Sequence, residues 1–222
     1  WGVSTRLIGA LVMSHSDDEG LILPPKIAPL QVVIVPIFNK DPETVARINR
    51  IADDLISYLK QHGVRVKFDN DDNTRAGFKF AEYELKGVPV RITLGARDIE
   101  NNIAEVARRD TKDKAAIALD KLAEHTLQLL DDIQANSDKK ARDFRTEHTT
   151  RVDTWDDFVR VLDEKSVFVS AHWDGTGATE EKIKELTKAT IRCIPLNNPQ
   201  EDGVCILTGK PSQQRVLFAR AY

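Results

Sequence analysis

Along the first half of the chain, apolar and polar positions alternate in the manner of strands and helices. Residues 31–37 form a continuous and largely β-branched run, which is typical of a parallel strand covered on both faces. Apolar residues then recur at helical spacing from Asp41, a favourable N-cap followed by Pro42, as far as Gly63. Residues 64–68 return as a strand, so the pattern predicts a βαβ unit within an α/β domain.

Shorter periodic segments extend this pattern toward the C-terminus. Helical spacing predicts a helix over 77–86, and apolar runs predict strands at 90–94 and 103–109. A long amphipathic helix is expected from about 117 to 144, because its apolar positions fall near one face. Beyond Trp155 the expected elements are a helix to 162, a strand at 167–170, a helix near 180–186 and short strands near 191, 204 and 216.

These elements divide the chain into five segments. We expect a leader over 1–23 with a buried strand at 6–13, a linker over 24–30, and an α/β domain with a mixed sheet and flanking helices over 31–116. A connecting long helix over 117–150 then leads to a small α+β domain over 151–222.

Composition places the chain among globular proteins. Of its 222 residues, 41% are hydrophobic and 30% are charged. This balance is typical of a globular protein with a buried core and not of a disordered chain. No apolar run approaches the roughly 20 residues of a membrane span, so we expect no membrane partner. The sequence opens at Trp1 without an initiator Met or a signal peptide, so we expect it to belong to a longer protein. Only two cysteines are present, and the expected compartment is the cytoplasm.

Charge and local clusters limit the candidate chemistry. The net charge is -3, so any contact with nucleic acid has to come from a local patch. His15, Asp17 and Asp18 could form a catalytic or metal cluster, but a polar turn between a buried strand and a linker explains them better. The turn at 38–42 lacks the glycines that cradle phosphates, which disfavours a nucleotide-binding flavodoxin-like domain.

Residues 1–10 (WGVSTRLIGA) resemble the last signature strand of class II aminoacyl-tRNA synthetases, in their prolyl branch. In that family the strand ends the catalytic domain, and its arginine lies against ATP, where a planar cation stacks on adenine and offsets phosphate charge. The resemblance implies that residues 1–23 end a catalytic domain, that Arg6 contacts ATP and that this chain contains no catalytic residue. Spacing alone favours a surface arginine beside a buried strand, and the ten-residue context supports the ATP contact.

A second segment, residues 74–80 (TRAGFKF) continuing to 95–98 (GARD), is similar to the anticodon-binding domain of prolyl-tRNA synthetases. The resemblance implies an anticodon site that consists of Phe80, Glu84, Arg91, Arg97 and Asp98, with Lys112 as a further basic residue and Lys114 as its alternative.

This set of residue types suits guanine, and proline anticodons have two adjacent guanines. Arg91 and Arg97 can donate to guanine O6 and N7, Glu84 can accept from guanine N1 and N2, and Phe80 offers a stacking face. Without the resemblance, Phe80 is more simply a core aromatic, while Glu84 and Arg91 are solvated or paired with each other.

The end of the chain, residues 189–195 (ATIRCIP) and 215–222 (RVLFARAY), resembles the C-terminal domain of archaeal and eukaryotic-like prolyl enzymes. Many members have a four-cysteine zinc site in this domain. The matching positions here are near Trp173, Thr179, Cys205 and Thr208. Cys193 matches a non-ligand position and His172 is poorly placed to complete a site, so no zinc is expected. Tyr222 matches a final tyrosine that in the family folds back toward the catalytic domain.

Together these resemblances imply the tRNA-recognition portion of a prolyl-tRNA synthetase, which joins proline to its tRNA using ATP with Mg. The expected partners are tRNA(Pro), with proline and ATP in the full-length enzyme, and a second copy in a homodimer; DNA is not expected. The alternative is a non-catalytic RNA-binding accessory or regulatory module with the same fold. Arg6 and its strand favour the synthetase, because a binding module needs no ATP-contacting strand.

Overall fold

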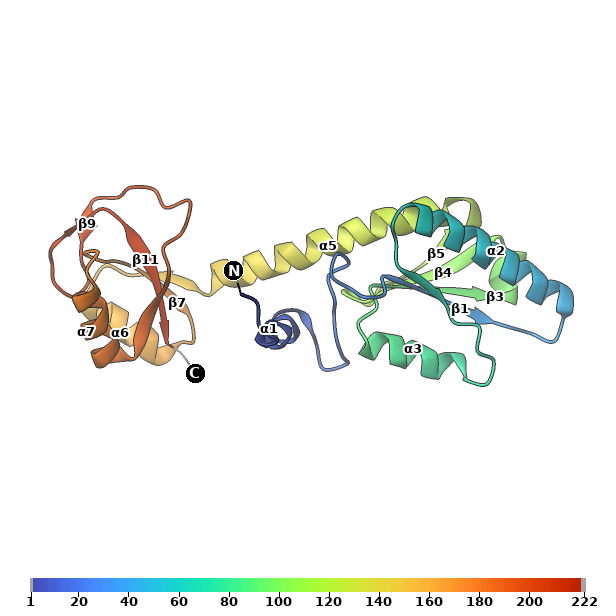
Figure 1. The fold of residues 1–222 in the computed structure, drawn as a ribbon, viewed down its shortest axis with the longest axis horizontal. Coiled ribbons are helices and arrows are strands. Elements are labelled where there is room, and N and C mark those ends of the chain that lie inside the picture. Colours follow the sequence, from blue (N-terminus) through green and yellow to red (C-terminus); the bar gives the residue numbers. More distant parts are fainter. Residues whose placement is uncertain (1, 221–222) are drawn as a thin grey trace. The chain divides into compact units, whose positions relative to one another are not determined.

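The computed structural model describes residues 2–220, which form two compact units. The first unit extends to residue 141 and the second begins at residue 142, so the division falls inside the long helix α5 (Leu122–Glu147). Each unit has its own sheet and its own hydrophobic core (Figure 1).

The first unit contains a five-stranded mixed sheet in the order β2-β1-β3-β4-β5. The strands β2 (Val66–Phe68), β1 (Val32–Ile37) and β3 (Val90–Gly95) run parallel to one another. The strands β4 (Ile103–Arg108) and β5 (Lys114–Ala118) are antiparallel to their neighbours. The α/β fold with a mixed sheet, expected from the sequence, is confirmed.

The two faces of this sheet are covered differently. The helices α2 (Pro42–Gln61) and α5 cover one face, where Ile34 belongs to the main core. The helix α3 (Ala76–Leu85) packs on the other face, against Val33 and Val35 of β1. Figure 1 shows α2 and α3 on opposite sides of the sheet. Because side chains alternate along each strand, the residues of one face pack against α2 and α5, and the residues of the other face pack against α3.

Part of the second face carries polar and small side chains, and we call it the open sheet face: Arg91, Thr93, Glu105, Lys114 and Ala116. Residues paired directly across neighbouring strands share a face, and Thr93 pairs with Glu105, which pairs with Ala116. Arg91 pairs with Ala107, which in turn pairs with Lys114. Most of β5 is exposed. Arg91 and Thr93 are buried, so the exposed part of this surface lies on its β5 side.

Two elements of the first unit differ from the sequence-based expectation. The long helix begins at Leu122 and not near 117, because residues Lys114–Ala118 pair with β4 and a 3₁₀ turn (Leu119–Lys121) follows. A short helix, α4 (Ala96–Glu100), follows β3 and was not predicted.

The leader was predicted wrongly as a buried strand. Residues Arg6–His15 form the helix α1, in which no residue is buried, and Leu7, Ile8 and Met13 are exposed. A strand needs neighbouring strands for its backbone hydrogen bonds, whereas a helix satisfies them within itself. The described residues offer no strand beside this segment, so the helix is the conformation that satisfies its backbone.

The second unit is a small α+β fold, as expected. Its four-stranded sheet has the order β6-β7-β11-β8. These strands are β6 (Thr149–Arg151), β7 (Phe168–His172), β11 (Arg215–Arg220) and β8 (Ala189–Cys193). The helices α6 (Trp155–Glu164) and α7 (Gly177–Thr187) belong to the same unit. Two further short strands, β9 (Gly203–Val204) and β10 (Pro211–Ser212), pair with each other. Phe158, Ile183 and Phe218 lie at the centre of its core.

Among residues 2–220, no helix combines the length and the apolar character that a membrane span requires. The final Tyr222, to which the sequence resemblance assigns a role, lies outside the described residues.

Candidate nucleic-acid interface

The arginine of the open sheet face is stacked under an aromatic ring. Arg91 of β3 is 4% exposed, and its guanidinium carbon lies 3.8 Å from the centre of the Phe80 ring of α3. Its Nη1 donates to Thr93 Oγ1 at 2.6 Å and lies 3.3 Å from Glu105 Oε1. These contacts fix the guanidinium plane at the border of the sheet and α3.

The remaining nitrogens of Arg91 are not satisfied. Nε and Nη2 are buried and have no hydrogen-bond partner among the described residues. Most buried donors in proteins are paired, because an unpaired one costs about 1–3 kcal/mol. Two adjacent free donors on a planar group match two adjacent acceptors, the arrangement that guanine O6 and N7 present.

The helix that carries Phe80 is fixed by a buried lysine. Lys79 is 3% exposed, and its Nζ donates to the carbonyls of Asp69 and Asp71 and lies 3.1 Å from Asp69 Oδ1. Tyr83 donates from its hydroxyl to Asp69 Oδ2 at 2.7 Å. Burial alone would raise the pKa of Asp69, but these hydrogen bonds outweigh it and hold the pKa below its usual value. The aspartate therefore remains ionised and ties the 69–71 loop to α3.

Glu84 lies one helical turn after Phe80, on the same side of α3. It is half-buried, and with Phe80, Arg91 and Arg109 it helps to line a small cavity of about 20 Å³. The structure thus brings together three of the residues that the sequence analysis named, Phe80, Glu84 and Arg91.

Arg97 and Asp98 lie apart from this cluster. Both belong to α4, which follows the opposite end of β3 from Arg91, and the four strand positions from Arg91 to Gly95 alone span about 13 Å. Arg97 is exposed. A Cβ at Gly95 would lie 2.9 Å from Asp98 Oδ2, so glycine allows the carboxylate to pack against the end of β3.

The two lysine candidates differ in their surroundings. Lys112 Nζ lies 2.8 Å from Glu19 Oε2 and 3.5 Å from Asp17 Oδ2, so it is engaged in ion pairs. Lys114 is exposed and lies on the open sheet face, in register with Arg91 through Ala107.

The remaining leader residues take up other positions. Arg6 is exposed at the start of α1, and His15 ends that helix. Asp17 and Gly20 pair across a tight turn, as expected for a polar connection, and Asp17 accepts two hydrogen bonds from Arg109. The hydrogen bonds from Arg109 hold the pKa of Asp17 well below its usual range. Asp18 is exposed in the same turn.

The segments that contain Thr179 and Thr208, which match zinc-ligand positions by resemblance, are joined by hydrogen bonds. Asp174 Oδ2 accepts from Thr179 Oγ1 at 2.8 Å and from Thr208 Oγ1 at 3.1 Å. Cys205 is buried and Cys193 is exposed. Residues 2–220 contain no group of three or more His, Cys, Asp or Glu side chains that could hold a metal ion. The sequence analysis did not single out Asp174, although an Asp before a helix start is a recognisable turn and capping signal.

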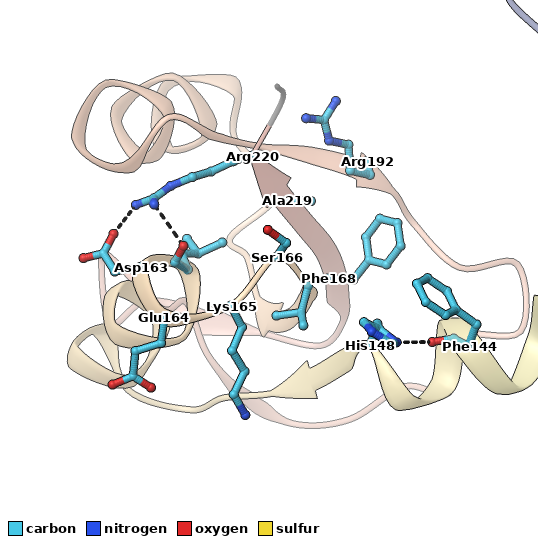
Figure 2. Close-up of a pocket in the computed structure, with 12 residues that line it drawn as sticks. Phe144, His148, Asp163, Glu164, Lys165, Ser166, Phe168, Arg192, Ala219 and Arg220 are labelled. Carbon is cyan, nitrogen blue, oxygen red and sulfur yellow. Dashed lines mark hydrogen bonds and ion pairs between the residues drawn. The ribbon is translucent and has the colours of Figure 1, made fainter. Parts of the chain in front are cut away.

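The second unit has a larger surface cavity that the sequence did not indicate. Its volume is about 670 Å³, and Phe144, His148, Phe168 and Arg192 are among its lining residues. Figure 2 shows the Phe144 ring beside His148, whose ring centre lies 3.9 Å away. In the same view Arg220 donates to the Asp163 carboxylate, and it also donates to the carbonyl of Leu162.

Two family models match the chain. The model described as "Anticodon binding domain" matches residues 31–129, and the model described as "Prolyl-tRNA synthetase, C-terminal" matches residues 155–222. The first match contains the Phe80, Glu84 and Arg91 cluster, and the second covers most of the α+β unit.

Curated relatives match over the whole chain. Proteins named proline--tRNA ligase are 59% identical over 222 residues in Porphyromonas gingivalis and 58% identical over 222 residues in Cytophaga hutchinsonii. Each match covers 100% of this chain and 45% of the relative, so the chain spans less than half the length of these relatives.

A solved structure has the same fold. The prolyl-tRNA synthetase of Cryptosporidium parvum, complexed with L-proline and AMP, superimposes with a TM-score of 0.87 at 36% sequence identity. The match covers 100% of this chain and 47% of that one. Taken with the family models and the curated relatives, it shows that the chain belongs to the prolyl-tRNA synthetase family, of which it contains the anticodon-binding domain and the C-terminal domain.

Proposed function

We propose that the first unit recognises the guanines of a proline tRNA anticodon on the cluster of Phe80, Glu84 and Arg91. The observation that carries this proposal is the pair of unpaired donors of Arg91, buried beneath the Phe80 ring. A guanine that enters from the open sheet face offers O6 and N7 to these donors. Such a contact replaces the missing hydrogen bonds of a buried cation.

The other two residues of the cluster complete recognition of the base. The Glu84 carboxylate accepts from guanine N1 and N2, donors that adenine does not present together. Phe80 provides an apolar surface against which an unstacked base can lie. Single-stranded loops suit this mode because their bases are free to leave the stack.

Positive side chains around the cluster hold the RNA backbone. Lys114 is exposed on the same face as Arg91, and we assign to it the role that the sequence analysis gave to Lys112. Arg97, at the far end of β3, contacts a neighbouring nucleotide, with Asp98 beside it. Contacts to phosphate add affinity without base specificity.

The activity of the longer protein is part of the same proposal. The relatives are named proline--tRNA ligases, and the Cryptosporidium parvum enzyme was crystallised with L-proline and AMP. We infer that the longer protein joins proline to its tRNA with ATP and Mg in the cytoplasm, as a homodimer, and that Arg6 contacts ATP. The present chain supplies tRNA recognition.

Binding to anticodon stem-loops tests the proposal. We expect Arg91→Ala to weaken binding to a loop with two guanines by about 1–3 kcal/mol, and to change binding to a loop with adenines in their place very little. Arg50→Ala is the matched control, because Arg50 is an exposed arginine on α2, on the other side of the sheet. Equal losses for both loops, or the same loss in the control, would contradict the proposal.

A further inference from the structure

A second buried arginine lies next to the proposed site and joins it to the leader. The Arg109 side chain is 3% exposed, and its Nε donates to the Glu84 carbonyl at 3.0 Å. Its Nη1 and Nη2 donate to Asp17 Oδ2 at 2.9 Å and to Asp17 Oδ1 at 2.5 Å. All three of its nitrogens are therefore engaged, and among residues 2–220 the carboxylate that they contact is that of Asp17.

The turn that carries Asp17 is packed tightly against the end of α3. Leu21 N donates to the Leu85 carbonyl at 3.0 Å. A Cβ added at Gly20, where φ is +141°, would lie 2.5 Å from Leu85 Cα. A Cβ added at Gly87, where φ is +70°, would lie 2.7 Å from Leu21 Cβ. Backbone packed this closely leaves Asp17 little freedom to move away from Arg109.

Arg109 and Glu84 would attract each other without Asp17. Both line the same small cavity, and no hydrogen bond or ion pair among residues 2–220 engages the Glu84 carboxylate. A guanidinium buried without a counter-charge is strongly unfavourable, so it would be drawn to the nearest available carboxylate. Besides Asp17, the carboxylates of Glu19 and Glu84 act electrostatically on Arg109. Glu19 is paired with Lys112, so the Glu84 carboxylate is the one available to Arg109.

We propose that Asp17 is a positioning residue for anticodon recognition: it neutralises Arg109 and so leaves the Glu84 carboxylate available to a guanine. This inference rests on the proposed function of the cluster. The role differs from a purely structural one, because its loss changes the preference for guanine and not only the amount of folded protein.

The Asp17→Asn and Asp18→Asn variants of the full chain form a matched pair. Both remove one negative charge from the same exposed turn, but of the two only Asp17 contacts Arg109. The measured quantity is the ratio of affinities for a stem-loop with two guanines and for the same loop with adenines. A ratio cancels any fraction of inactive protein, so partial unfolding does not imitate the effect.

We expect Asp17→Asn to lower this ratio about five- to ten-fold, because the Arg109 guanidinium then forms an ion pair with the Glu84 carboxylate. We expect Asp18→Asn to leave the ratio unchanged. Asp17→Glu restores the counter-charge, and we expect it to keep the ratio within about two-fold of the parent chain. Equal ratios in Asp17→Asn and Asp18→Asn would overturn the inference, as would a loss in Asp17→Glu as large as in Asp17→Asn. A parent chain that does not prefer guanine would instead refute the proposed function.

Discussion

Thr93 offers a direct test of how the Arg91 guanidinium is held. Both side chains are buried, at 4% exposure each, and Thr93 Oγ1 accepts from Arg91 Nη1 at 2.6 Å. Replacing Thr93 by Val keeps the shape and removes the acceptor. A hydrogen bond to a charged group contributes about 1.5–3 kcal/mol, so we expect the free energy of unfolding to fall by that amount. The second acceptor of Nη1, Glu105, is 3.3 Å away and replaces the lost bond only in part.

Urea denaturation, followed by circular dichroism, measures this loss. Thr93→Ser is the control, because it keeps the hydroxyl and removes a methyl group worth about 1 kcal/mol. We expect the Val variant to be less stable than the Ser variant and to bind a guanine loop more weakly. If the Val variant is as stable as the parent chain and binds as well, Thr93 does not orient Arg91 and our account of the site is wrong.

Two further predictions concern the stability of each unit. Asp174→Ala removes an acceptor shared by Thr179 and Thr208, so we expect the second unit to lose about 1–3 kcal/mol, measured by thermal melting, with the exposed Asp202→Ala as control. Asp110 is 7% exposed; burial alone would raise its pKa, but hydrogen bonds from Arg108 and other donors lower it below the unfolded value of about 3.9. The ionised Asp110 carboxylate therefore stabilises the folded state above about pH 4, and this stabilisation is lost as the pH falls through the pKa of the folded state. We expect Asp110→Asn to reduce the fall in the free energy of unfolding at acid pH. An unchanged fall at acid pH would contradict this.

Local patterns in the sequence predicted most of the elements but missed those that depend on pairing. The β-branched residues 31–37 and the Asp41 cap each have one stable local conformation, and both elements are present. The segment Lys114–Ala118 is rich in alanine, and only its pairing with β4 makes it a strand. In the leader the apolar run predicted a strand, but the segment is a helix, because a strand forms only where other strands are available to pair with it.

The sequence predicted the residues of the candidate site that belong to a recognisable motif, but not the contacts that join distant segments. The motif resemblance named Phe80, Glu84 and Arg91, which the fold brings together. The Asp17 and Arg109 pair joins residues 92 positions apart, and no local pattern indicates such a contact. The sequence left two lysines as candidates for the further basic residue, and our proposal of Lys114 rests on tertiary contacts: Lys112 is paired with Glu19, whereas Lys114 begins β5 on the open sheet face.

One measurement tests the central claim most directly. A stem-loop in which each anticodon guanine is replaced in turn by 7-deazaguanine loses only the N7 acceptor. If the free Nε and Nη2 of Arg91 bind O6 and N7, one of these substitutions weakens binding by about 1–2 kcal/mol in the parent chain and has no effect in Arg91→Ala. Unchanged binding of the parent chain at both positions, or an equal loss in both proteins, would contradict recognition of guanine by Arg91.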